Sequence, residues 1–219
     1  MRQKEQKKTK AARLFYIAVL LVIFALIGVY LQKKCGLEFG SLFKSKQPDL
    51  EIKQETQKKW AQALELPGVP NLHKVSDNLY RGAQPSNEGM RQLEKLGIKT
   101  IVNLRTVHSD RDEIENTELS YEHIPMLTWN TQDDDVVRFL KIVTDSNNTP
   151  VFVHCQYGAD RTGTMCAIYR IAVEGWNKNE AIDEMTKGGF GYHSIFKNLT
   201  DYIQSLNIDE IRHAAGLSK

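Results

Sequence analysis

One stretch of the sequence, VFVHCQYGADRTG at residues 151–163, carries the residue types that could do chemistry. Cys155 follows an apolar run that is typical of a buried strand, and Arg161 stands six residues further on, with Gly158 between them. A thiolate is a nucleophile and a metal ligand, and a guanidinium can bind two phosphate oxygens at once. The spacing therefore leaves four uses open for Cys155: packing, metal binding, redox chemistry and nucleophilic catalysis.

The first three of these uses fit the residues less well than the fourth. A zinc site needs further Cys or His at ligand spacing, and no second pair accompanies His154 and Cys155. A redox dithiol needs the spacing C-x-x-C, which is absent, and a nucleotide P-loop needs a Lys after its glycine. Packing alone leaves Arg161 and the glycines unexplained. A thiolate beside a phosphate cradle is a nucleophile aimed at phosphorus.

The elements around this stretch must place it at one edge of a sheet. Apolar strands are expected at 98–105 and 151–155, with weaker ones within 75–86 and at 121–126. Helices are expected at 87–96, 134–145, 163–174, 178–187 and 195–206. Buried strands that alternate with helices predict an α/β fold with a central, mainly parallel sheet flanked by helices. Ligands gather at the carboxyl ends of such strands, where Cys155 would lie.

The loop after Cys155 is expected to bind the phosphate. Its amides can point inward as an anion nest, with a helix N-terminus behind them. The same positive surroundings would lower the pKa of Cys155 and favour the thiolate. The candidate phosphate-binding residues are Gln156, Tyr157, Gly158, Ala159, Asp160 and Arg161.

The pattern H-C-x-x-G-x-x-R-T resembles the signature loop of cysteine-dependent protein tyrosine and dual-specificity phosphatases. Across about residues 70–206 the chain is similar to the bacterial membrane-associated or periplasmic dual-specificity phosphatases of the TpbA type. The segments that carry this wider resemblance are LYRGAQPS, GIKTIVNLR, IPM and GWNKNEAIDEMTKGGFG.

The resemblance implies a two-step reaction with no metal and no cofactor. Cys155 would attack phosphorus and form a phosphocysteine, while Arg161 and the loop amides hold the phosphoryl oxygens. Thr162 would donate a hydrogen bond to the departing thiolate. An Asp from a neighbouring loop would protonate the leaving group and then activate water.

The identity of that Asp is the open point in the sequence. The family's acid position falls near Asn130, which cannot donate a carboxyl proton. Asp133, Asp134 and Asp135 follow closely, and Asp133 is our candidate for the general acid because it lies nearest the loop. The alternative is that all three residues simply favour the N-terminus of the helix that begins there.

The N-terminal part of the chain is expected to be a membrane anchor. Residues 1–13 carry six basic side chains and one Glu, and residues 14–31 form an uncharged run of 18 residues. As a helix, that run would span about 27 Å, and the positive-inside rule keeps the basic segment in the cytoplasm. A cleaved signal peptide is the alternative, although its apolar region is usually shorter and ends in small residues.

These observations predict five segments along the 219 residues. They are a cytoplasmic N-terminus at 1–13, a transmembrane helix at 14–31, a tether at 32–66, a phosphatase domain at 67–213 and a tail at 214–219. A helical turn is expected at 60–66, before PGVP. The catalytic domain would lie on the periplasmic or extracytoplasmic side of a single-pass membrane protein.

The remaining expectations concern substrate and partners. The chain outside 1–13 has 23 basic and 26 acidic residues, which argues against nucleic acid as a partner. A phosphoprotein is the expected substrate, with phosphotyrosine first and phosphoserine or phosphothreonine as further candidates. An inositol phosphate or phosphoinositide phosphatase is the second hypothesis, and a phosphate-binding pseudoenzyme is the third. The oligomeric state is not predicted.

Overall fold

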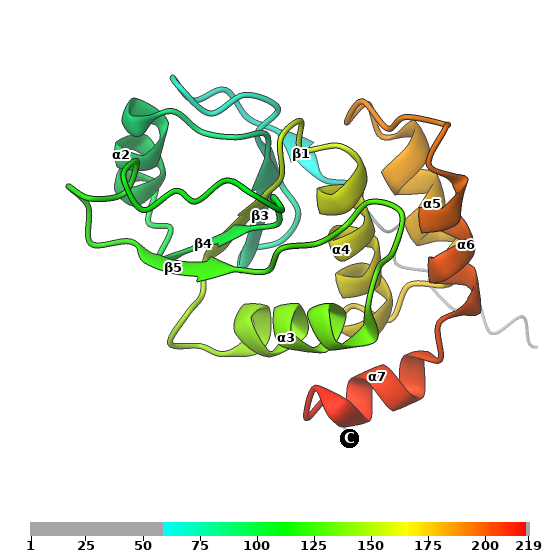
Figure 1. Ribbon diagram of the computed structural model, residues 1–219. Coiled ribbons are helices and arrows are strands. Elements are labelled where there is room, and N and C mark those ends of the chain that lie inside the picture. The colour runs from blue at the N-terminus through cyan, green and yellow to red at the C-terminus, as the bar shows by residue number, and fades with distance from the viewer. Residues whose placement is uncertain (1–58, 218–219) are drawn as a thin grey trace, which may run out of the picture. The chain divides into compact units, whose positions relative to one another are not determined.

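The centre of the fold is a six-stranded sheet with the order β1-β2-β3-β6-β4-β5 (Figure 1). In the computed structural model, which describes residues 59–217, the strands β3, β6, β4 and β5 run parallel. β2 is antiparallel to both of its neighbours, β1 and β3. The strands are β1 (Gln62–Ala63), β2 (His73–Lys74), β3 (Leu79–Gly82), β4 (Thr100–Asn103), β5 (Ser120–His123) and β6 (Val151–His154).

Helices cover both faces of this sheet (Figure 1). Along each central strand, alternate side chains enter two separate cores, because successive residues of a strand point to opposite faces. Tyr80, Ile101 and Phe152 pack with α2, whereas Val102 and Val153 pack with the larger group of helices from α3 to α7. The helices are α2 (Asn87–Lys95), α3 (Asp133–Thr144), α4 (Asp160–Ala172), α5 (Lys178–Lys187), α6 (Lys197–Ser205) and α7 (Ile208–Ala214).

The observed elements confirm the predicted α/β class, with parallel strands at the centre of the sheet. All residues of β4 and β6 are buried, which accounts for their nearly continuous apolar sequence. α4 starts at Asp160, three residues before the predicted start, because the loop after Cys155 turns directly into the helix. β1, β2 and α7 were not predicted.

The expected helical turn at 60–66 is wrong. Gln62 and Ala63 instead form β1, paired with β2. The reason is that tertiary pairing with β2 at the sheet edge determines the conformation of this short segment, whose own preference for helix or strand is weak. The compact unit of the chain begins at Lys58, so this segment packs with the domain rather than with a tether that ends at 66.

The predicted anchor at 14–31 and the basic segment at 1–13 lie outside the described residues. Within residues 59–217, no helix combines the length and the apolar composition needed to cross a membrane.

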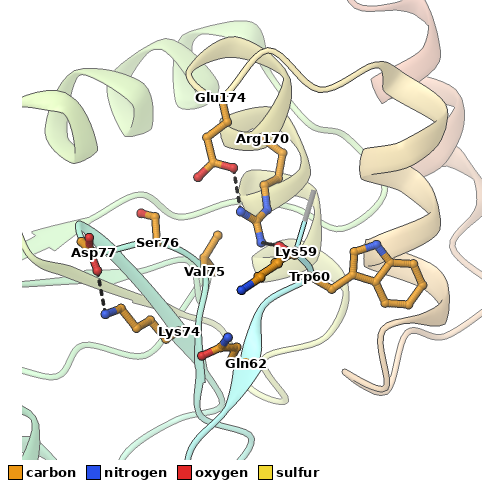
Figure 2. A pocket seen from close by; sticks show the side chains of 9 residues that line it. All are labelled: Lys59, Trp60, Gln62, Lys74, Val75, Ser76, Asp77, Arg170 and Glu174. Atoms are coloured by element: carbon orange, nitrogen blue, oxygen red, sulfur yellow. Dashed lines mark hydrogen bonds and ion pairs between the residues drawn. The ribbon is translucent and has the colours of Figure 1, made fainter. Parts of the chain in front are cut away.

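A buried ion pair joins the first described residues to α4 and α5. The guanidinium of Arg170 donates to both carboxylate oxygens of Glu184 at 2.8 and 2.7 Å. Glu184 also accepts from the amide of Ala61 at 2.6 Å, and Arg170 donates to the carbonyl of Lys59 at 3.3 Å. Figure 2 shows Arg170 between Glu174 and Lys59 beside a small cavity. Because a buried charge is stable only when it is paired, these contacts fix where the chain enters the domain.

Candidate active site

Cys155 lies where β6 ends and the chain turns toward α4, and only 2% of its surface is exposed. The turn depends on Gly158, which has a φ of +69°. A Cβ at this position would lie 2.4 Å from the backbone of Gly82, so only glycine allows the loop to pack this closely. The loop is therefore short, and it is pressed against the segment that follows β3.

Arg81, the third residue of β3, holds this loop from beneath. Its buried guanidinium donates to the carbonyl oxygens of Gly158 at 2.7 Å and Ala159 at 3.4 Å, and lies 3.9 Å from the ring of Phe190. A trans peptide directs its N–H away from its C=O. The amides of Ala159 and Asp160 therefore point away from Arg81, as an anion nest requires. Arg81 is a positioning residue for the loop.

The surroundings of Cys155 favour its thiolate. Burial alone would raise the pKa of the thiol, but the net shift is downward. The hydroxyl and the amide of Thr162, the charge of Arg161 and the amide of Tyr157 together lower the pKa more than burial raises it. The buried hydroxyl of Thr162 forms no hydrogen bond with another group of the described residues, so it is available to the thiolate. In Cys166, by contrast, burial raises the pKa to about 11, so this thiol stays protonated.

Arg161 faces a cavity at the mouth of the loop. The cavity has a volume of 360 Å³ and is lined by three segments: Arg105–Val107, Thr128–Trp129 and the loop residues Gln156, Tyr157 and Arg161. Two guanidinium groups, those of Arg105 and Arg161, contribute to this lining, and no Asp or Glu among the described residues does. Such a cavity suits an anion.

The carboxylate of Asp160 is used within the fold. Its two oxygens accept hydrogen bonds from the amide and the Nδ1 of His193, both at 2.8 Å. The side chain therefore fixes the turn before α6, and the backbone amide of Asp160 remains its candidate contribution to phosphate binding. Tyr157 is fixed similarly, because its carbonyl accepts from the side chain of Asn71 at 3.0 Å.

A chain of buried polar groups lies behind Cys155. His154 Nε2 is 2.7 Å from Oδ2 of Asp110, and both side chains are fully buried. Asp110 Oδ1 accepts from Gln84 at 2.8 Å, and Gln84 in turn accepts from Arg105 at 2.9 Å. Sequence analysis missed Asp110 and Gln84. Asp110 precedes Cys155 by 45 residues in a loop without regular structure, and no spacing pattern marks it.

The candidate general acid, Asp133, lies at the start of α3. Its Oδ1 accepts a hydrogen bond from the hydroxyl of Tyr202 at 2.7 Å, and Asp133 is not among the residues that line the cavity. The neighbouring turn at 127–130 does reach the cavity, through Thr128 and Trp129. The role of Asp133 as the acid stays a prediction.

Comparisons with known proteins agree with this geometry. A family model described as a DSP-PTPase phosphatase fused to NAD+ kinase matches residues 68–198. The dual specificity protein phosphatase TpbA of Pseudomonas aeruginosa is 33% identical over 156 residues, which cover 71% of this chain and 70% of that protein. Inositol diphosphatase DSP5 of Arabidopsis thaliana is 25% identical over 128 residues, covering 54% and 61%.

The structural comparison gives the same relative. A crystal structure of a P. aeruginosa TpbA variant in complex with pTyr matches with a TM-score of 0.65 and 31% identity, covering 73% of this chain and 97% of that one. A lowered-pKa cysteine, a glycine-bearing loop and an arginine at the mouth of an anion cavity thus coincide with the matched region. The chain belongs to the DSP-PTPase family of protein tyrosine and dual-specificity phosphatases.

Proposed function

We propose that this chain is a membrane-anchored protein phosphatase that hydrolyses phosphotyrosine through a phosphocysteine intermediate. The observation that carries the proposal is the depressed pKa of Cys155 in a loop whose mouth holds Arg161. The thiolate attacks phosphorus, the ester P–O bond breaks, and the leaving oxygen takes a proton from the general acid. Water then attacks phosphorus, the S–P bond breaks, and the thiolate returns to its hydrogen bond from Thr162.

The rim of the cavity supports an aromatic phosphate ester as the substrate. Trp129 and Tyr157 both line the cavity, and they are 73% and 65% exposed. Exposed aromatic rings beside an anion site can pack against a phenyl ring that carries the phosphate. The TpbA relative has been crystallised with pTyr. Phosphoserine and phosphothreonine offer no ring to this rim and are the weaker candidates.

An inositol phosphate is the second candidate substrate. Arg105 and Arg161 both face the cavity and could bind more than one phosphate group, and the DSP5 relative is named an inositol diphosphatase. The loop itself, from Gln156 to Arg161, contains no Lys that would neutralise further phosphates. Phosphoproteins are therefore preferred.

The anchor at 14–31 would place the catalytic domain outside the cytoplasm. The basic residues before it support this orientation. We expect alkaline phosphatase fused after Lys219, a reporter that folds only outside the cytoplasm, to be active in cells. A cytoplasmic reporter such as green fluorescent protein at the same position serves as the matched control, and fluorescence without phosphatase activity would reverse the orientation.

The first test of the catalytic proposal is hydrolysis by the purified chain. We expect turnover of p-nitrophenyl phosphate and of phosphotyrosyl peptides, with Cys155→Ser lowering it by about 10³-fold or more. Arg161→Lys should lower it by about 10²-fold, because an ammonium cannot bind two oxygens in a plane. Cys166→Ser is the control and should retain activity. Turnover of inositol phosphates well above that of phosphopeptides would favour the second candidate, and turnover independent of Cys155 would contradict both.

The role of Thr162 can be tested through the pH dependence of thiol alkylation. Because its hydroxyl lowers the pKa of Cys155, Thr162→Val should move the midpoint for alkylation of Cys155 by iodoacetamide to higher pH. Mass spectrometry of the Cys155 peptide separates this thiol from Cys35 and Cys166. Thr164→Val is a matched control, since the Thr164 hydroxyl donates to the Asp160 carbonyl instead. An unchanged midpoint in Thr162→Val would remove the hydroxyl from this role.

The general acid can be tested with leaving groups of different basicity. If Asp133 donates the proton, Asp133→Asn should slow phenyl phosphate hydrolysis by about 10²-fold and p-nitrophenyl phosphate hydrolysis much less. Asp134→Asn is the control on the same turn. Unchanged kinetics in Asp133→Asn would exclude it as the acid.

A further inference from the structure

Three metal-ligating side chains converge in the loop between β4 and β5, outside the catalytic cavity. The ligand atoms of His108, Asp110 and Glu113 all lie within 4.8 Å of one another. We infer that these three residues bind a divalent transition-metal ion of the Zn²⁺ class. The inference does not depend on the proposed phosphatase activity.

The two distances from His108 to the carboxylates fit a shared ion. His108 Nε2 is 3.2 Å from Oδ1 of Asp110 and 3.3 Å from Oε1 of Glu113. In a tetrahedral zinc site with metal–ligand distances of about 2.0–2.1 Å, adjacent ligand atoms lie about 3.3–3.4 Å apart. The imidazole nitrogen thus lies at ligand-to-ligand distance from both carboxylates.

Two buried atoms of the cluster form no hydrogen bond within the described residues, although the first of them lies at ion-pair distance from both carboxylates. They are Nε2 of His108 and Oε2 of Glu113. Buried polar atoms in native proteins are normally paired, and an ion is one of the ways to satisfy them. In the described part of the chain, no Lys or Arg forms an ion pair with Asp110 or Glu113.

Outer contacts hold the ligands in place, as they do in known metal centres. Gln84 donates to the Asp110 oxygen that faces His108, at 2.8 Å, and His154 holds the other oxygen of the same carboxylate. The side chain of Asn103 donates to the carbonyl of His108 at 2.9 Å. The loop is therefore braced before any ion binds.

The donor set selects the class of ion. One imidazole and two carboxylates suit zinc and its first-row neighbours, whereas Ca²⁺ and Mg²⁺ prefer oxygen ligands alone. Three protein ligands leave a fourth position for water. The competing interpretation is a metal-free cluster in which His108 contacts the two carboxylates directly, and the experiment separates the two.

The test is calorimetric titration of chelator-treated, full-length Cys155→Ser protein with ZnCl₂. The Cys155→Ser background removes the catalytic thiolate as a competing ligand. We expect one Zn²⁺ per chain, with the affinity reduced by about 100-fold or more in His108→Gln and in Glu113→Gln. His213→Gln, which changes an exposed histidine in α7, is the matched control and should bind like the parent. Circular dichroism confirms that each variant is folded.

Co²⁺ provides a second readout of the ligand type. The bound ion should give visible ligand-field bands without a thiolate-to-cobalt charge-transfer band, and the bands should be lost in Glu113→Gln. No saturable binding in the Cys155→Ser background would overturn the inference and favour the metal-free interpretation. Equal binding by His108→Gln, Glu113→Gln and His213→Gln would overturn it as well, by placing the ion elsewhere.

Discussion

The close approach of the loop at Gly158 to the backbone of Gly82 is the constraint on which the active site depends. It brings two distant parts of the chain into contact, the end of β3 and the end of β6. These strands are neighbours in the sheet, so their carboxyl ends meet at one edge. A side chain at Gly158 would force the loop away from Gly82 and from Arg81, and the amides that Arg81 orients would no longer face a common point.

Arginine side chains near this edge of the sheet are of two kinds: one is buried, and two line the cavity. Arg81 is buried, donates to loop carbonyls, lies over the ring of Phe190, and acts on the shape of the loop. Arg161 and Arg105 line the cavity and are available to an anion. The buried Asp110 is paired with His154 and connects through Gln84 to Arg105. The lining of the cavity thus carries two guanidinium groups, and the carboxylate of Asp110 is used within the fold.

The sequence predicts those parts of the candidate site that are contiguous. Cys155, Gly158, Arg161 and Thr162 fall within eight residues, and each has a distinct chemical reason to be there. The long helices and the two central strands could also be predicted from the sequence, because their apolar patterns are strong. Asp110 and Gln84 could not be found in this way, since their roles come from tertiary contacts with His154 and Arg105. β1 was not predicted for the same reason. Two residues are too few to show a hydrophobic periodicity, and only the pairing with β2 makes them a strand.

The proton donor is the hardest residue to assign because it must come from a different segment than the proposed nucleophile. The proposed nucleophile and the proposed phosphate-binding residues come from one short loop, which is fixed by glycine packing and by Arg81. The acid must come from a different segment, and the one that reaches the cavity, the turn at 127–130, ends in Asn130. Asp133 lies just beyond this turn, held by Tyr202 from α6. Tyr202 occupies only one oxygen of this carboxylate, and Asp133 does not line the cavity. As the acid it would therefore have to approach a bound ester from outside the lining, whereas the proposed nucleophile lies in a loop whose position is already fixed.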